Sequence, residues 1–165
     1  MGKEVKEFNR RVQKYVEIHR KAVDSVPTPK TSTDPALIVR NQQALAAVIR
    51  ASRPSAMPGE IFVPRVRPMF VRIIKQQLQG KQGKRARATV LDDGNPKSPE
   101  SPAKVKLSIN ADYPADAPLS SVPPSLLMAL PSLPEQLEYR FVGRTLILRD
   151  TKANIIVDFI EDVVP

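Results

Sequence analysis

The chain has no cysteine, no tryptophan and only one histidine among its 165 residues. Without cysteine it cannot form disulfide bonds, iron–sulfur clusters, thiol nucleophiles or zinc sites of the cysteine type. A single histidine excludes every site that needs two imidazole groups. No apolar run approaches the roughly 20 residues that a membrane-spanning helix requires. The charged segment 1–20 also lacks the apolar core of a signal peptide.

Proline, by contrast, is abundant: its 17 residues are about twice the usual share, and nine of them lie between positions 96 and 134. A hydrophobic content of 41% is sufficient for a folded core. We therefore predict one domain, 1–165. It would comprise a helical part (1–92), a mobile loop rich in proline and serine (93–103) and a β-rich part (104–165).

The formal net charge of +9 is unevenly distributed. Segments 1–53 and 54–92 each carry a net +6, whereas 93–165 carries −3. A basic N-terminal part and an acidic C-terminal part indicate one of two things: an anionic partner that binds the N-terminal part, or attraction between the two parts within one fold. Attraction within the fold is the simpler explanation.

The segment 3–24 predicts the first helix. Its apolar residues recur every three or four positions and share one face, with lysines and an arginine opposite them. Pro27 and Pro29 place its end near Asp24. The apolar stripe consists of Val5, Phe8, Val12, Tyr15, Val16, His19, Ala22 and Val23.

The segment 35–52 predicts a second helix. Thr33 or Asp34 is a suitable N-cap, and Pro35 suits the first helical position. Asn41 falls within the apolar face, so we expect a buried amide with a partner on the neighbouring helix. The rest of that face consists of Leu37, Ile38, Leu45, Val48 and Ile49.

Shorter helices are expected further along the chain. One begins at Pro64, directs Phe70 into the core and ends at Gly80 and Gly83. The segment 84–91 predicts a further short helix. The segment 124–130 predicts one or two helical turns between prolines.

The C-terminal part predicts strands. The segment 105–109 alternates apolar and polar residues, and 137–160 predicts a three-stranded meander. Gly143 is suited to the first position of a two-residue hairpin turn. The first turn pairs Phe141 with Leu146, Tyr139 with Leu148 and Glu138 with Arg149.

A second turn, centred on Lys152 and Ala153, is predicted to pair Leu148 with Val157 and Leu146 with Phe159, so that every apolar partner shares one face. The opposite face is mixed, which indicates a partly covered face or an interaction surface. Its residues are Arg140, Ile147, Arg149, Ile156 and Asp158, of which Arg140, Arg149 and Asp158 are the candidate interaction residues. Because helices precede strands, the fold class is α+β: three to four N-terminal helices packed on a small C-terminal antiparallel β-meander.

The sequence of the predicted C-terminal strands resembles the signature of a protein family. The sequences YRFVGR (139–144), LRD (148–150) and ANIIVDF (153–159) resemble the C-terminal signature of a family of uncharacterised small bacterial proteins that look exported. The family has no known activity, so the resemblance supplies no functional residues. It implies a periplasmic or secreted location, with a cytoplasmic location as the alternative.

The motifs for common catalytic chemistry are missing. His19 lies in the apolar stripe of the first helix, which is typical of a hydrogen-bonded core histidine. No Gly-x-Ser-x-Gly turn presents a nucleophile, and no glycine-rich phosphate loop or dinucleotide fingerprint is present. We therefore assign no catalytic residue and expect no cofactor.

Carboxylates are the remaining option for acid–base or metal chemistry. Asp158, Glu161 and Asp162 cluster near the C-terminus and could bind a hard cation. The EF-hand spacing is absent, however, and a solvated acidic tail is the simpler explanation. We assign no metal ligand.

The best candidate for anion binding is the basic segment 81–87, with Lys81, Lys84, Arg85 and Arg87. Base stacking would also require neighbouring aromatic side chains, and the nearest, Phe70, is expected in the core. We therefore predict a non-enzymatic binding or structural module of the bacterial cell envelope or exterior, with a protein partner. A nucleic-acid or polyanion binder acting through 81–87 is the alternative, and a carboxylate-based enzyme is a second alternative.

Overall fold

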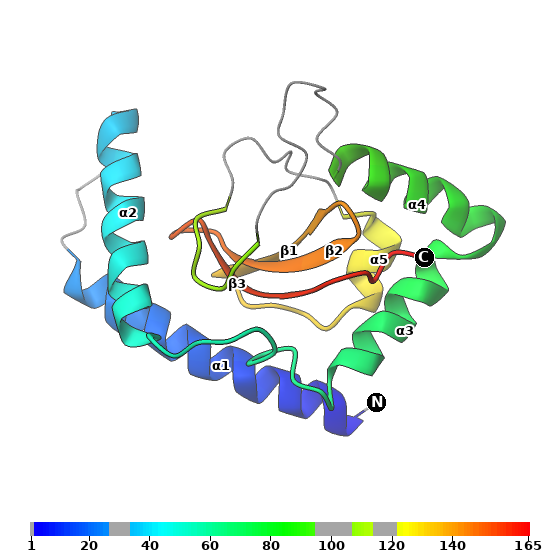
Figure 1. The fold of residues 1–165 in the computed structure, drawn as a ribbon, viewed down its shortest axis with the longest axis horizontal. Helices are drawn as coiled ribbons and strands as arrows, with labels where there is room; N and C mark the ends of the chain where they lie inside the picture. Colours follow the sequence, from blue (N-terminus) through cyan, green and yellow to red (C-terminus); the bar gives the residue numbers. More distant parts are fainter. Residues whose placement is uncertain (1, 27–33, 95–106, 114–121) are drawn as a thin grey trace.

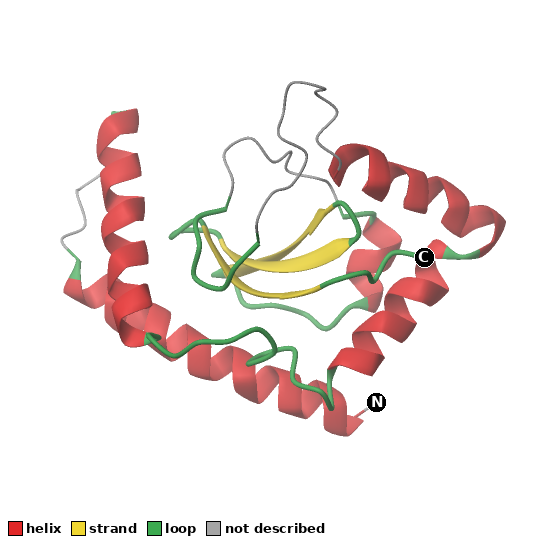
Figure 2. Ribbon diagram, in the orientation of Figure 1, coloured by secondary structure: helices red, strands yellow, loops and turns green. Residues whose placement is uncertain are grey.

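The computed structural model describes residues 2–26, 34–94, 107–113 and 122–165, and these form an α+β fold (Figure 1). The helices are α1 (Gly2–Ser25), α2 (Pro35–Ser52), α3 (Arg67–Leu78), α4 (Gly80–Gly94) and α5 (Pro124–Ala129). The strands β1 (Leu137–Val142), β2 (Thr145–Asp150) and β3 (Ile155–Ile160) form one antiparallel sheet in the order β1-β2-β3. Figure 2 shows the sheet at the centre, with helices along its sides. None of the described helices is long and apolar enough to span a membrane.

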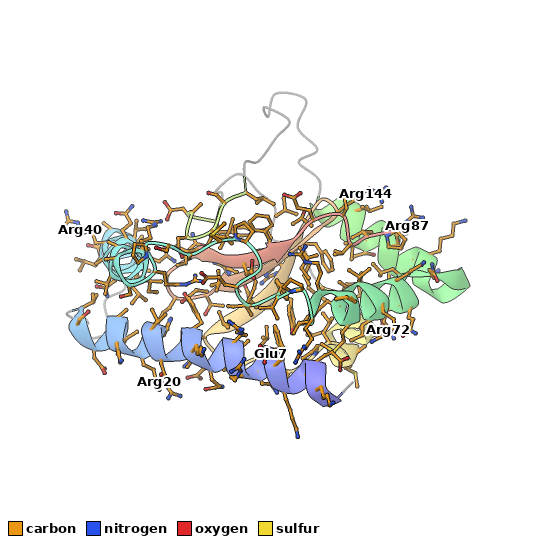
Figure 3. All side chains as sticks on the ribbon, turned by 60° about the horizontal axis from the view of Figure 1, so that its bottom comes forward. Glu7, Arg20, Arg40, Arg72, Arg87 and Arg144 are labelled. Carbon is orange, nitrogen blue, oxygen red and sulfur yellow. The ribbon has the colours of Figure 1, made fainter. Side chains whose placement is uncertain are left out.

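Helix α1 confirms the predicted amphipathic stripe. Phe8, Val12, Tyr15, Val16, His19 and Ala22 are buried, and Val5 and Val23 pack against the core from its margin. Figure 3 shows α1 crossing beneath the sheet, with Arg20 on its outer side. The apolar face therefore supports the sheet while the charged face meets solvent.

Helix α2 has the predicted bounds but packs over only part of its length. Asp34 is the N-cap, and its Oδ1 accepts the Ala36 N–H at 3.0 Å. Leu37 and Ile38 are 38% and 53% exposed, so the prediction that they face the core is wrong. The N-terminal end of α2 projects beyond the sheet (Figure 1), and only Leu45, Ala46 and Ile49 are buried. Asn41 is half-buried beside a cavity rather than buried between helices.

Helices α3 and α4 form a hairpin. Helix α3 begins later than predicted because Val63 to Val66 make a turn, in which the Val63 carbonyl accepts the N–H groups of Val66 and Arg67. Gly80 adopts a φ of +77° at the junction, as predicted for a helix end. Helix α4 then starts at once. Gly83 lies inside it, where an added Cβ would come 2.5 Å from the Leu78 backbone.

The β1–β2 hairpin has the predicted register. Phe141 pairs with Leu146, Tyr139 with Leu148 and Glu138 with Arg149. Gly143 at the turn has a φ of +57°, which explains the need for glycine.

The predicted β2–β3 register is wrong beyond the turn. Leu148 pairs with Asp158, not Val157, and Leu146 pairs with Ile160, not Phe159. A β-bulge causes the shift, since Arg149 pairs with Ile156 and Val157 becomes the extra residue. The bulge keeps Val157 in the main core and moves Phe159 to the opposite face.

That opposite face of the sheet is covered, which confirms one of the two expectations for it. Val142, Ile147, Ile156 and Phe159 form a second apolar cluster with Tyr113, against which Leu107 and Ile109 pack. Residues 107–109 are not in a strand, contrary to prediction. Instead Asp112 forms a single bridge with Ile155. Residues 105–106, and most of the predicted loop 93–103, lie outside the described residues.

Aromatic rings join the helices to the sheet in the main core. The Phe70 ring lies 4.9 Å from Phe8 and 4.9 Å from Phe62, measured between centroids, and 6.0 Å from Tyr139. These rings come from α1, the segment before α3, α3 and β1. One cluster therefore fixes four parts of the chain.

Candidate functional site

His19 is a hydrogen-bonded core residue, as predicted. Its Nδ1 lies 2.6 Å from Oδ2 of Asp150, and the same oxygen accepts the Tyr15 hydroxyl at 2.6 Å. The other carboxylate oxygen, Oδ1, accepts the backbone N–H groups of Lys152 and Ala153 at 3.0 Å. The last residue of β2 is thereby tied to α1 and to the turn that follows it.

The electrostatics of this cluster favour an ionised Asp150. Burial raises the pKa of Asp150, but hydrogen bonds from His19, from the Ala153 backbone and from Tyr15 outweigh it and lower the pKa below its ordinary value. Burial, reinforced by the Asp150 charge, raises the pKa of the Tyr15 phenol. Because the ionised carboxylate only accepts hydrogen bonds, His19 Nδ1 donates to it.

Asp158 is not available to a partner, contrary to the prediction that it lies on the interaction face of the sheet. It is fully buried, and its carboxylate accepts the backbone N–H groups of Gly59, Ile61 and Phe62 at 2.8–2.9 Å. The bulge in β3 explains this position, because it turns the carboxylate towards the segment between α2 and α3. Asp158 therefore anchors that segment to the sheet.

Arg140 and Arg149, the other two candidate interaction residues, are part-buried and bound to Glu138 of the same sheet. Arg149 also donates to Asn154 and lies over the Tyr113 ring. Burial raises the pKa of Glu138, but the hydrogen bonds from both guanidinium groups outweigh it and lower the pKa. The ion pairs, hydrogen bonds and ring contact of these side chains therefore stabilise the covered face of the sheet.

The acidic residues near the C-terminus do not converge. Asp158 points into the core, whereas Glu161 and Asp162 are exposed. Among the described residues, no group of three His, Asp or Glu side chains is placed to hold a metal ion.

The predicted anion-binding residues lie on α4. Lys84 and Arg85 are exposed and Arg87 is half-buried, with its Nε buried and unpartnered. Lys81 belongs to α4, but its side chain lies outside the described part. Figure 3 shows Arg87 on α4 in the same half of the molecule as Arg72 on α3.

Helix α3 adds basic residues that were not among the predicted anion-binding residues. Arg67, Arg72 and Lys75 are exposed and line a shallow groove of about 600 Å³ with Pro68 and Val71. Their spacing of three to five residues on one helix was a signal that could have identified this face.

The α3–α4 hairpin is basic over most of its length, and its two acidic residues, Asp92 and Asp93, come only at the end of α4. Between Glu60 and Asp92 the chain has eight basic residues and no acidic one. Elsewhere arginines form ion pairs, as Arg10 does with Glu7 and Arg50 with Asp112. Among the side chains that the structure describes, no basic residue of α3 or α4 forms an ion pair with a carboxylate. Arg72 and Glu4 interact only through a longer-range electrostatic attraction.

Comparison with known proteins gives no relative: no protein-family model, no curated protein and no solved structure matches the chain.

Proposed function

We propose that the protein is a non-enzymatic binding module that docks an acidic protein segment on the outer face of α3, with α4 contributing further positive charge. The observation that carries this proposal is the basic stretch between Glu60 and Asp92, whose described side chains lack carboxylate partners. Unpaired like charges on one hairpin repel each other, and an acidic partner would relieve that repulsion.

The composition of the groove favours a protein segment over a nucleic acid. Pro68 and Val71 lie among the basic residues, so the groove offers apolar contact as well as charge. Single-stranded nucleic acids are held by exposed aromatic rings, whereas the aromatic residue of α3, Phe70, is fully buried. An acidic segment that also carries aliphatic side chains matches both properties of the groove.

The alternative function, an enzyme that uses carboxylates for catalysis, has less support. Asp150 and Asp158 have their oxygens occupied by the protein's own donors, which leaves neither carboxylate in a position to act on a substrate. The C-terminal resemblance to exported bacterial proteins favours a module of the cell envelope or exterior.

The test is direct binding to a labelled peptide of alternating glutamate and leucine. Replacing Arg67, Arg72 and Lys75 by glutamine should weaken binding about tenfold or more, because several interfacial charges and their steering effect are lost together. The matched control replaces Lys6, Lys14 and Lys21, which are exposed on α1, and should change affinity by less than about twofold.

Two outcomes would contradict the proposal. An equal loss in the α1 control would show attraction by net charge alone. Tighter binding of a DNA duplex than of the peptide, with a salt dependence that weakens in the α3 variant, would favour the nucleic-acid alternative.

A further inference from the structure

The outer face of α3 is regular enough to indicate the shape of its partner. Its exposed residues form two rows with a spacing of four positions: one runs from Arg67 to Gln79, and the other runs from Pro68 to Gln76. The residues between the rows are buried, apart from the half-buried Gln77. The same two rows line the groove of about 600 Å³. Because rows with this spacing form parallel ridges on a helix, the groove lies between two ridges of α3.

The rest of the chain does not occupy these ridges. In the part of the chain that the structure describes, the side chains of both rows form no hydrogen bond or ion pair. Figure 1 shows α3 at the margin of the molecule, with α5 on its inner side. The ridges carry Arg67, Arg72 and Lys75 and no acidic residue. Their charge therefore selects a negatively charged occupant.

The backbone of α3 favours a helical occupant over an extended one. The interior of a helix uses its own N–H and C=O groups, so α3 offers only side chains to a partner. An extended segment gains affinity from backbone hydrogen bonds to a sheet edge, which α3 cannot supply. A helical segment satisfies its own backbone and can place a ridge in the groove of α3, with the two axes crossing at about −50°.

We propose that the acidic segment docked on α3 is an amphipathic helix of another protein. Apolar side chains on one of its ridges pack against Pro68 and Val71, and carboxylates on either side of that ridge pair with Arg67, Arg72 and Lys75. Carboxylates three or four residues apart match these basic residues, since Arg67 and Lys75 lie about 12 Å apart along the helix axis. This inference rests on the proposed function and specifies the conformation of its partner.

A second copy of this chain does not supply such a helix among its described elements. Helices α2, α3 and α5 contain no acidic residue. On α1, seven basic residues outnumber four acidic ones, and Glu7 is already bound to Arg10 and Arg11. The two acidic residues of α4, Asp92 and Asp93, are adjacent in sequence and therefore do not share one face.

The test compares three labelled peptides of equal net charge by fluorescence anisotropy. The one-face peptide has about 20 residues in an alanine background, with leucine and glutamate at helical spacing on one face. The proline peptide differs only by a central proline, which breaks the helix without changing its charge. The third is the alternating glutamate–leucine peptide. We expect the one-face peptide to bind about tenfold or more tightly than either of the others.

The apolar part of the groove has its own test. Val71→Gln should weaken binding of the one-face peptide about threefold or more, because it removes an apolar contact between the ridges. The matched control is Val39→Gln on α2, which should change the affinity by less than about twofold. Val71 and Val39 are 36% and 46% exposed, so neither substitution alters the core. An equal effect of the two substitutions would contradict the docking of a helix in this groove.

The outcomes separate this inference from the proposed function. If all three peptides bind equally and the triple variant Arg67→Gln, Arg72→Gln, Lys75→Gln weakens each of them, the helical partner is wrong and the proposed function stands. If no peptide binds, or the triple variant binds the peptides as the native protein does, both are wrong. Dimerisation in sedimentation experiments that the triple variant abolishes would place a second copy on this face and overturn the inference.

Discussion

At the scale of single residues, two buried carboxylates connect the sheet to α1 and to the segment between α2 and α3. Asp150 looks like a surface charge in the sequence, since it lies between Arg149 and Thr151, whereas Asp158 is a single carboxylate between the apolar residues Val157 and Phe159. Their distant partners lie 96 to 135 positions away along the chain. Tyr15 and His19, four residues apart on one helix face, were a visible sign that α1 offers two donors to a common acceptor.

Asp150→Asn should destabilise the protein by about 3 kcal/mol at neutral pH, because the variant loses a charged acceptor and places amide hydrogens against the donors of Tyr15 and His19. Urea unfolding measures the loss. Asp24→Asn, at an exposed position, should cost less than about 0.5 kcal/mol. A similar small loss at Asp150 would contradict the role given to this cluster.

The same carboxylate predicts a dependence on pH. The pKa of Asp150 is lower in the folded protein than its ordinary value of 3.8, so the unfolded chain binds a proton first as the pH falls. The stabilisation is therefore complete above that ordinary value and is lost as the pH falls through the folded pKa. Below about pH 4 the free energy of unfolding should fall more steeply in the native protein than in Asp150→Asn.

At the scale of elements, local sequence signals place most helix and strand boundaries. Tertiary packing explains the features that depart from the sequence pattern. The Asp34 cap and the Gly80 junction place helix ends where the sequence indicates. The apolar pattern of α2 was misleading in its first half, because the helix extends past the sheet that would cover Ile38. The β3 register was wrong because one extra residue, Val157, is accommodated as a bulge.

The β1–β2 turn offers a test of local backbone geometry. Gly143→Ala places a Cβ on a residue with a φ of +57°, and it should lower the free energy of unfolding by about 1 kcal/mol. Gly2→Ala, where an added Cβ meets no atom within 4 Å, is the control and should change stability by less than about 0.5 kcal/mol. Equal stability of the two variants would contradict the strained turn.

At the scale of the whole molecule, the two apolar clusters on either face of the sheet contain segments from both halves of the chain. The cluster around Phe70 draws on α1, α3 and β1, so the helices and the sheet depend on each other. This arrangement predicts that they unfold together as one domain.

Phe70→Ala tests that prediction. Removal of a fully buried ring should cost about 3–5 kcal/mol. Helical circular dichroism and tyrosine fluorescence, measurable without interference because tryptophan is absent, should shift to lower denaturant together. Separate midpoints for the two signals would show that the helical and β-rich parts fold independently.

The sequence by itself determined the α+β class, the amphipathic α1, the N-cap of α2 and the register of the β1–β2 hairpin. These features depend on periodicity, capping and turn residues, which act over a few positions. Tertiary structure decided the burial of Asp158, the bulge at Val157, and the places of His19 and the α3 basic residues at candidate sites. Those outcomes depend on which distant groups meet, because a buried carboxylate with its hydrogen-bond donors exists only once separate segments pack together.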